Sequence, residues 1–407
     1  MTHYDALETR PRAQRQAEQL SALNALLAAP PAPALAARLE GQGPLADLAA
    51  LATLPVLRKS ELVALQAEHP PFGGLTARGA GGFRHVFQSP GPIYEPGGGA
   101  ADWWRMGRFL HACGIGRGDV VQNCFSYHLT PAGAIFESGA AAVGAAVLPA
   151  GTGQTDLQVR AAHDLGVTAW AGTPDYLKVI LDRAEEQGIR LAITRAAVGG
   201  GALFPALRAE YADRGIACRQ CYATADLGNI AYESAALEGM IVDEGVIVEI
   251  VRPGTGDPVS EGEVGEVVVT TLNPDYPLLR FATGDLSAIL PGESPCGRTN
   301  LRIRGWMGRA DQTTKIKGMF VRPEQVAELV SRHTEILRAR VVAGRDGAQD
   351  TMTVCIETPD ATGSPDLGAR IADSVQAVLK MRGTVTFLAP GALPNDGKVI
   401  EDTRSYD

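Results

Sequence analysis

Two cysteines, Cys218 and Cys221, have the spacing of a redox pair or of half a zinc site. They lie in a segment that we predict to be a strand, where residues i and i+3 point to opposite faces. The two sulfur atoms would then be unable to converge on one metal ion. We interpret both as core residues, because an unpaired cysteine is often simply a small buried hydrophobic residue. All six cysteines are scattered along the chain and are expected to be reduced thiols.

Two glycine clusters, at residues 114–118 (GIGRG) and 199–201 (GGG), could approach a phosphate closely. Neither has the full spacing of a dinucleotide-binding loop, and the first cluster precedes an expected strand instead of following one. From the residues alone, both clusters are interpreted as turns.

Short apolar strands alternate with helices between residues 119 and 214. The expected strands begin at residues 120, 144, 168 and 196, and the expected helices cover residues 129–139, 157–165, 176–187 and 204–214. This alternation predicts a largely parallel α/β sheet. A separate helix is expected over residues 12–27, where leucines recur at helical spacing before Pro30 and Pro31.

The pattern changes after Glu238. Strands over residues 246–251 and 265–270 flank the Gly/Pro-rich stretch 253–258, which predicts an antiparallel β module. The C-terminal region should hold a helix (323–333), a hairpin (340–343 and 351–357, joined through Asp346 and Gly347), a second helix with Leu367 and Ile371 on its apolar face, and a last strand (384–388). We therefore predict two domains, residues 1–310 and 311–407.

The chain has 407 residues, 45% of them hydrophobic, and a net charge of −9 from 37 Lys+Arg and 46 Asp+Glu. This composition is typical of a globular protein. It argues against nucleic acid or an anionic membrane as a partner, because both require clustered basic residues. The polar start of the chain does not resemble a signal peptide, and the least polar stretch contains Glu137, so a cytoplasmic protein without a membrane span is expected.

Six segments in a fixed order carry a family resemblance. They are GDVVQNCFSY (118–127), GTPDY (172–176), PLLRFATGDL (277–286), PCGRT (295–299), GRAD (308–311) and KGMFVRP (317–323). Together they resemble the phenylacetate-CoA ligase branch of the adenylate-forming acyl-CoA synthetase superfamily. The resemblance implies an α/β protein with a large N-terminal adenylate-forming domain, built of mixed α/β sheets plus a β module, and a small mobile α+β C-terminal domain.

In that family a carboxylic acid first attacks the α-phosphate of ATP, which gives an acyl-adenylate and pyrophosphate, and the acyl group then passes to CoA. The resemblance implies ATP/AMP, Mg²⁺ and CoA as cofactors. Asp285 would accept hydrogen bonds from the ribose hydroxyls, Arg309 would contact the ribose or phosphate, Asp311 would be the hinge between domains, and Lys398 would neutralise charge on the α-phosphate. Three of these residues also have a simpler interpretation. Asp285 could be a turn residue, Arg309 part of a surface ion pair, and Lys398 a solvated loop lysine.

The family's phosphate loop, SSGTTGKP, aligns with residues 89–96 (SPGPIYEP). Ser89 and Gly91 are retained as cofactor-binding candidates. Two prolines remove backbone donors, Tyr94 adds bulk, and Glu95 reverses the charge of the family's lysine. A charge reversal at about 4 Å from a phosphate could cost several kcal/mol, so the binding of the β- and γ-phosphates is expected to be compromised.

Two further nucleotide segments are altered. The family's YGxSE motif aligns with residues 222–226, where Tyr222 is expected near the base and Asp226 keeps a carboxylate for Mg²⁺ on a shorter arm. The adenine-binding segment begins with Gly199 and Gly200 but lacks the family's glutamate. The zinc ligands of some relatives align with Ser234, Ile241, Ser294 and Cys296, and one ligand of four predicts no zinc site.

The acyl pocket is expected around Tyr127 and His128, with Phe125 and Phe136 nearby. These aromatic residues could equally pack a core helix. His128 is a candidate general base, and no partner for it is visible in the sequence.

We predict an atypical adenylate-forming ligase for a small, aromatic carboxylic acid, with CoA or another acyl acceptor as its second substrate and a homodimer as one possible assembly. One alternative is a non-catalytic or ATP-independent homologue that binds nucleotide, CoA or acyl-adenylate. Another is an amide-forming ligase on the same fold. Lys398 separates catalysis from mere binding, because its replacement by alanine should abolish adenylation alone.

Overall fold

The structure is a computed structural model, and it describes residues 3–310, 312–316, 319–346, 349–361 and 363–404. The chain divides into two compact units. The first comprises residues 1–248, 269–281 and 290–306, and the second comprises residues 249–268, 282–289 and 307–407. None of the helices in the described ranges combines the length and the apolar character that crossing a membrane requires.

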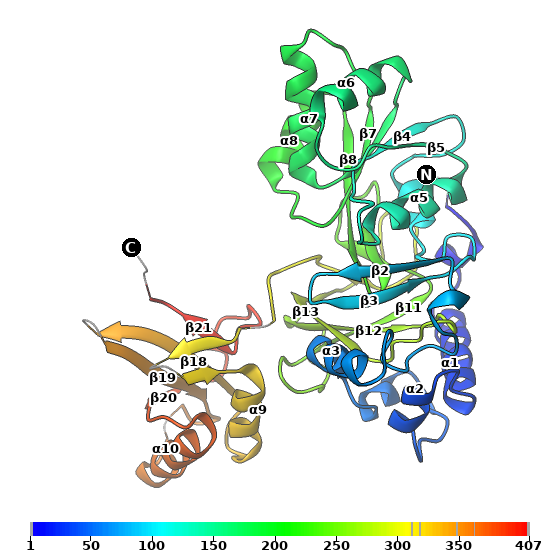
Figure 1. Ribbon diagram of the computed structural model, residues 1–407. Helices are drawn as coiled ribbons and strands as arrows, with labels where there is room; N and C mark the ends of the chain where they lie inside the picture. Colours follow the sequence, from blue (N-terminus) through cyan, green and yellow to red (C-terminus); the bar gives the residue numbers. More distant parts are fainter. Residues whose placement is uncertain (1–2, 311, 317–318, 347–348, 362, 405–407) are drawn as a thin grey trace. The chain divides into compact units, whose positions relative to one another are not determined.

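A nine-stranded sheet, in the order β14-β15-β10-β9-β8-β7-β6-β4-β5, is the largest in the molecule (Figure 1). Pairing is parallel from β5 to β8 and antiparallel from β8 through β9 and β10 to β15. The strands are β4 (Val120–Asn123), β5 (Ala146–Pro149), β6 (Ala169–Gly172), β7 (Arg195–Val198), β8 (Ala217–Thr224), β9 (Gly228–Glu233), β10 (Met240–Val242), β14 (Ile289–Leu290) and β15 (Arg302–Ile303). The predicted parallel α/β sheet is confirmed.

Helices cover both faces of the parallel strands (Figure 1). One face carries α4 (Gly107–Ala112) and α5 (Ala132–Val143), and the other carries α6 (Thr155–Asp164), α7 (Pro174–Glu186) and α8 (Pro205–Asp213). Cys221 belongs to the apolar core on the α5 side and Cys218 to the core on the other side. The interpretation of these two cysteines as core residues on opposite faces is thus confirmed, and all six cysteines are unpaired thiols.

Helix α5 differs from its predicted range at both ends. It begins three residues later than expected, after a loop that extends to Pro131, and it continues to Val143. Gly144 then ends the helix with φ of 76°, a left-handed conformation that glycine adopts without steric cost.

The N-terminal region packs on a second, four-stranded sheet, in the order β1-β13-β12-β11. Its strands are β1 (Leu57–Arg58), β11 (Val246–Val251), β12 (Gly265–Thr271) and β13 (Phe281–Ser287). The region contains α1 (Arg12–Ala28), α2 (Pro33–Arg38), α3 (Lys59–Glu68), short 3₁₀ turns (Ala6–Thr9, Ala49–Thr53, Ala80–Gly82) and the hairpin of β2 (His85–Ser89) and β3 (Ile93–Gly97). The predicted helix over residues 12–27 and the two predicted strands of the β module are present.

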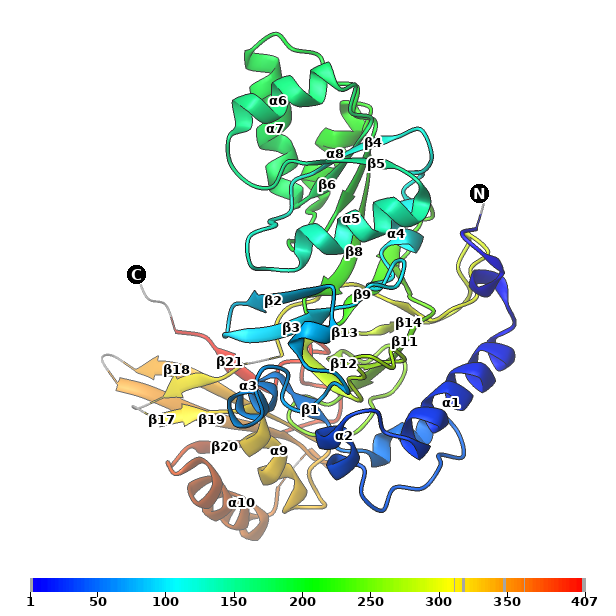
Figure 2. The same cartoon turned by 45° about the vertical axis from the view of Figure 1, so that its right-hand side comes forward.

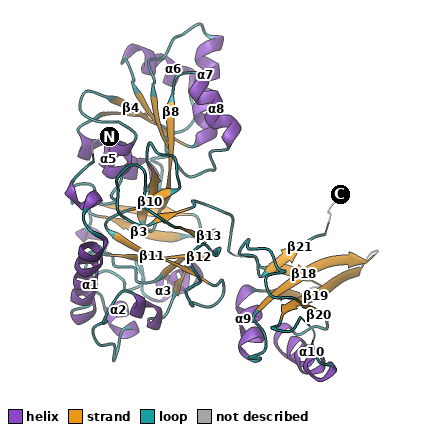
Figure 3. Ribbon diagram, turned by 180° about the vertical axis from the view of Figure 1, so that it is seen from behind, coloured by secondary structure: helices purple, strands orange, loops and turns teal. Residues whose placement is uncertain are grey.

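The C-terminal part contains a four-stranded sheet, in the order β20-β19-β18-β21, with both of its helices in one shared core (Figure 3). The elements are β16 (Thr314–Ile316), β17 (Met319–Val321), α9 (Pro323–Ser331), β18 (Arg338–Asp346), β19 (Gln349–Glu357), α10 (Pro365–Leu379), β20 (Thr384–Leu388) and β21 (Ile400–Asp402). The predicted hairpin is confirmed, although Gly347 lies outside the described residues. The prediction that β20 is the last strand is wrong, because β21 pairs in parallel with β18.

Candidate nucleotide and acyl site

The segment aligned with the phosphate loop forms a tight hairpin. Strands β2 and β3 pair antiparallel, with Ser89 opposite Ile93 across the turn. Gln66 of α3 holds the outer edge of β3, since its amide donates to the Tyr94 carbonyl at 2.8 Å and accepts from the Tyr94 N–H at 2.8 Å. Figure 2 shows α3 beside this hairpin. The backbone of Tyr94 is therefore already hydrogen-bonded within the protein.

Ser89 and Glu95 interact with each other inside the hairpin. The Ser89 hydroxyl donates a hydrogen bond to Oε1 of Glu95. Glu95 is 1% exposed and Ser89 is 7% exposed. The serine retained from the family motif thus contacts the residue that replaces the family's lysine.

Glu95 is close enough to a second carboxylate, Asp226, to be affected by its charge; Asp226 follows β8 and is 5% exposed. Burial, as the largest cause, and repulsion from Asp226 together raise the pKa of Glu95 to about 7, against the opposing effects of the Ser89 hydrogen bond and the charge of Lys59. The Lys59 ammonium, at the start of α3, lies 3.0 Å from Oδ2 of Asp226.

Gly199 and Gly200 follow β7 and lie close to two of the aromatic candidates. A Cβ on Gly199 would lie 2.9 Å from the Cys221 sulfur and 3.7 Å from the Phe136 ring, and a Cβ on Gly200 would lie 3.6 Å from the Phe125 ring. Tyr222 is buried on the adjacent strand β8. The structure therefore brings the expected adenine segment next to the expected acyl pocket.

Asn123, at the end of β4, positions the loop that carries the other acyl-site candidates. Its amide donates to the Tyr127 hydroxyl at 2.8 Å and to the Gly133 carbonyl at 2.8 Å. Its side-chain oxygen accepts from the Phe125 N–H at 3.2 Å. Phe125 and Phe136 are buried and stack on each other, with ring centroids 4.2 Å apart.

Tyr127 and His128 lie apart from this aromatic stack. Both residues are exposed overall, but the Tyr127 hydroxyl is partly buried. This burial, together with the nearby Glu137 carboxylate, raises the pKa of Tyr127. Four predicted acyl-site residues thus fall into a buried aromatic pair and an exposed pair on the same loop.

Asp285 and Arg309 lie side by side in the second unit. Arg309 Nη1 lies 2.8 Å from Asp285 Oδ1, and the two residues form an isolated antiparallel bridge. Gly284, with φ of 73°, allows this arrangement, because a Cβ there would lie 2.8 Å from Arg309 Nη2. Asp311 lies outside the described residues, so its role as a hinge stays a prediction.

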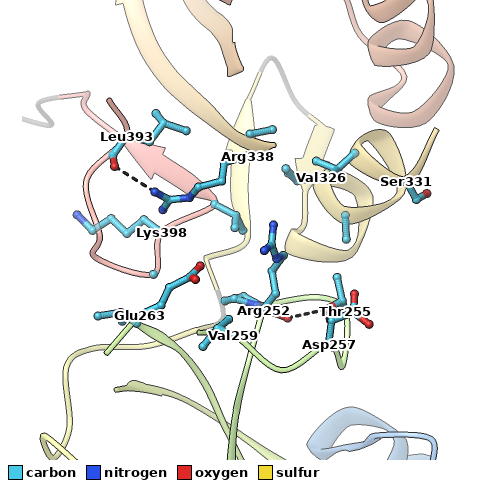
Figure 4. Close-up of a pocket in the computed structure, with 17 residues that line it drawn as sticks. Arg252, Thr255, Asp257, Val259, Glu263, Val326, Ser331, Arg338, Leu393 and Lys398 are labelled. Carbon is cyan, nitrogen blue, oxygen red and sulfur yellow. Dashed lines mark hydrogen bonds between the residues drawn. The ribbon is translucent and has the colours of Figure 1, made fainter. Parts of the chain in front are cut away.

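Lys398 lines a cavity of about 240 Å³ within the second unit (Figure 4). Arg252, Arg338, Asp257 and Glu263 also line it, so the cavity contains charges of both signs. The Lys398 ammonium is 4.0 Å from Glu401 Oε1, and its backbone N–H donates to Asp396. Gly397 lets the chain turn close to Val264, since a Cβ there would lie 2.7 Å from Cγ1 of Val264.

The four positions aligned with zinc ligands are all buried, and three of them carry polar or thiol side chains. Cys296 is 3.0 Å from the Ser294 hydroxyl and packs in the same core as Ile241. Burial opposes ionisation of Cys296, but hydrogen bonds from Ser234, Ser294 and Arg298 lower its pKa to about 7. Arg298 Nε also forms an ion pair with the buried carboxylate of Glu8 at 3.0 Å.

Sequence reasoning missed Lys59 and Gln66. Lys59 is 167 residues from its partner Asp226, and neither Lys59 nor Gln66 belongs to one of the segments that carry the family resemblance.

No protein-family model matches the chain. A phenylacetate-coenzyme A ligase of Thermus thermophilus is 28% identical over 265 residues, which cover 63% of this chain and 60% of that protein. A phenylacetate-coenzyme A ligase of Aromatoleum evansii is 30% identical over 273 residues, covering 64% and 61%. The matches thus span about three fifths of the length of these relatives.

Solved structures agree with the fold over a longer stretch. The open conformation of 2-hydroxyisobutyryl-CoA ligase, crystallised with 2-HIB-AMP and CoA, matches with a TM-score of 0.71 and 24% identity, covering 97% of this chain and 93% of that one. The same ligase in its thioesterification state matches with a TM-score of 0.69 and 24% identity, covering 98% and 92%. Over 63% and 64% of its length the chain is similar in sequence to these two phenylacetate-coenzyme A ligases, and it has the fold of 2-hydroxyisobutyryl-CoA ligase.

Proposed function

We propose that the protein activates a small carboxylic acid as an acyl-adenylate and transfers the acyl group to CoA. The observation that carries this proposal is the pairing of Asp285 with Arg309 across a backbone bridge. A carboxylate and a guanidinium held side by side can meet the ribose hydroxyls and a phosphate of one nucleotide. Homology to ligases with this activity supports the same function.

The other site residues have roles that follow from their chemistry. Tyr222 and the Gly199–Gly200 segment would hold the adenine ring, because a buried aromatic ring and close backbone approach suit a flat base. Lys398 would supply positive charge at the α-phosphate during adenylation. Asp311 would be the hinge of the smaller domain, residues 311–407.

Residues that suit Mg²⁺ are present, because Oδ1 of Asp226 is buried and is not hydrogen-bonded within the described part of the chain. Asp226 would hold the ion, which when bound neutralises phosphate charge. The structure of the β2–β3 hairpin supports the proposal that the protein binds the β- and γ-phosphates of ATP weakly. Two of its turn residues are prolines, the backbone of Tyr94 is bonded to Gln66, and the Ser89 hydroxyl is bonded to Glu95.

For the acyl group, the first candidate is a small aromatic acid. The relatives are named for phenylacetate, and the Phe125–Phe136 stack lies beside the glycine segment. The ligase of similar fold takes the smaller 2-hydroxyisobutyryl group, so both acids belong in the first substrate panel. The exposed His128 would serve as a general base only if it turned toward bound substrate.

Two assays test the proposal. The first measures exchange of labelled pyrophosphate into ATP with phenylacetate, benzoate or 2-hydroxyisobutyrate. The second measures thioester formation from the corresponding acyl-adenylate and CoA. We expect slow exchange and readily detected thioester formation, and failure of both assays with every acid would overturn the ligase function.

The altered hairpin favours a second candidate, an ATP-independent homologue that binds a nucleotide, CoA or an acyl-adenylate. Thioester formation from supplied acyl-adenylate without any pyrophosphate exchange would favour it. An amine acceptor in place of CoA would reveal an amide-forming ligase. A cytoplasmic location and a homodimer are also proposed, and analytical ultracentrifugation tests the latter.

A further inference from the structure

Three buried oxygen atoms in the first unit have no hydrogen-bond partner among the described residues: Glu95 Oε2, Asp226 Oδ1 and the Tyr276 hydroxyl. Their residues are between 1% and 5% exposed. A buried polar atom without a partner is costly, and a buried carboxylate oxygen is more so. Three such atoms are therefore suited to a polar or cationic ligand.

The three groups belong to one electrostatic neighbourhood although they come from different elements. Glu95 lies on β3, Asp226 follows β8, and Tyr276 precedes β13. Burial, and then the negative charges of Asp226 and Glu95, raise the pKa of Tyr276. Tyr276 therefore lies close enough to both carboxyl groups to be affected by their charges.

The surrounding contacts hold these groups in place. Ser89 binds one oxygen of Glu95, and Lys59 binds one oxygen of Asp226, so that each carboxylate has its other oxygen available. Thr271 holds the Tyr276 segment, because its hydroxyl donates to the Tyr276 carbonyl at 3.3 Å and accepts from the Leu278 N–H at 2.9 Å. Each group is thus positioned by a neighbour that leaves one oxygen unpaired.

The charges in this neighbourhood do not balance when both carboxyl groups are ionised. Glu95 and Asp226 supply two negative charges, and Lys59 supplies one positive charge. Carboxylate and hydroxyl oxygens are the ligands that hard divalent cations prefer. A divalent cation would bind both unpaired carboxylate oxygens and remove their mutual repulsion.

We propose that Glu95 and Asp226 together bind one divalent cation, Mg²⁺ or Mn²⁺, between Oε2 of Glu95 and Oδ1 of Asp226. The glutamate that replaces the family's phosphate-loop lysine then adds a second protein ligand for the ion, beyond Asp226. The bound cation would supply positive charge at the place where the family has a lysine and this chain has Glu95. This inference adds to the proposed function and rests on it for the ion's role toward phosphate, but ion binding itself requires neither nucleotide nor acid.

The experiment measures Mn²⁺ binding to the full chain without nucleotide, by electron paramagnetic resonance of free Mn²⁺ at pH 8. We expect one bound ion in the unaltered protein. Glu95→Gln keeps the shape of the side chain and should weaken binding at least about tenfold, as should Asp226→Asn. Glu40→Gln makes the same charge change at an exposed position and should bind like the unaltered protein.

A further variant covers the case in which Glu95→Gln fails to fold. Lys59→Met removes the cation that competes for Asp226 and should tighten Mn²⁺ binding several-fold. Absence of binding in the unaltered protein at millimolar Mn²⁺, equal binding by Glu95→Gln, or no tightening in Lys59→Met would each overturn the proposal. If Glu95-dependent binding is found but no acid yields a thioester, the metal site stands and the ligase function falls.

Discussion

Arg309 Nη1 lies 2.8 Å from Oδ1 of Asp285, directly over the backbone of Gly284. The carboxylate is nearly buried, whereas the side chain of Arg309 is 56% exposed. A pair of this kind contributes little to folding, because solvent screens the exposed partner. Its position at the end of the RFATGD segment supports the proposal that this pair contacts a nucleotide.

Gly284→Ala tests whether this geometry matters for nucleotide binding. The new Cβ would lie 2.8 Å from Arg309 Nη2 at a φ of 73°, so the guanidinium must move away from Asp285. We expect a loss of about 1–2 kcal/mol in the free energy of unfolding from the left-handed backbone. AMP affinity, measured by isothermal titration calorimetry, should also fall by about tenfold or more, an estimate based on the loss of one charged hydrogen bond.

Gly262→Ala is the matched control, because Gly262 has a φ of 83° and a Cβ there would meet no atom within 4 Å. It should lose similar stability and keep its AMP affinity. Equal AMP affinities of the two variants would show that the Asp285–Arg309 pair does not hold the nucleotide.

Lys398→Ala should separate the two half-reactions. We expect pyrophosphate exchange to fall by about 10²-fold or more, because removal of one group that stabilises charge in the transition state has that effect. Thioester formation from supplied acyl-adenylate should change little. Lys178→Ala, in the helical surface ion pairs of α7, should leave both rates unchanged. An equal fall in both half-reactions of Lys398→Ala would contradict this role.

The parallel sheet and the C-terminal helix α10 could both be predicted from the sequence, because their elements have apolar patterns of their own. The inward positions of α10, including Leu367, Ile371 and Val375, recur at helical spacing, and all of them are buried. Strand β21 has only three residues and is defined by its pairing with β18, so no local pattern could reveal it.

The candidate site was predictable only where local motifs exist. Asp285 and Arg309 stood out through their motifs, and the charge reversal at Glu95 was visible in the alignment. Its burial, its hydrogen bond from Ser89 and its proximity to Asp226 depend on tertiary contacts. The Lys59–Asp226 pair joins residues that are 167 positions apart, and such pairing has no signature in a single sequence.

Phe136→Leu tests whether the aromatic stack shapes the acyl pocket. Leucine removes the ring face that packs on Phe125 and leaves space beside Gly199. We expect a destabilisation of about 1–3 kcal/mol and a relative gain for phenylacetate over 2-hydroxyisobutyrate in thioester formation. Phe109→Leu is a control of the same size in the same core, because Phe109 is fully buried and contacts Phe136 edge-on. It should lose stability without a change in acid preference, and an equal change of preference in both variants would contradict the assignment.

Asp102 should make the stability of the protein depend on pH. Burial, as the largest cause, and the nearby Asp243 carboxylate together raise the pKa of Asp102 to about 6, against hydrogen bonds from the Gly107 and Met106 N–H groups. Because the folded state holds this proton more tightly than the unfolded state, Asp102 stabilises the fold below pH 4. That contribution is lost as the pH rises through about 6.

Asp102→Asn removes this titration and keeps an oxygen that can accept from the Gly107 N–H. Asparagine also tolerates the φ of 49° at this position. Relative to the unaltered protein, we expect the variant to gain stability between pH 4 and pH 6.5, by on the order of 2–3 kcal/mol in urea unfolding, and to stay level above that range. Asp156→Asn should show no such gain, because Arg183 lowers the pKa of the exposed Asp156. A flat difference for Asp102→Asn across this range would mean that Asp102 is ionised in the folded protein throughout.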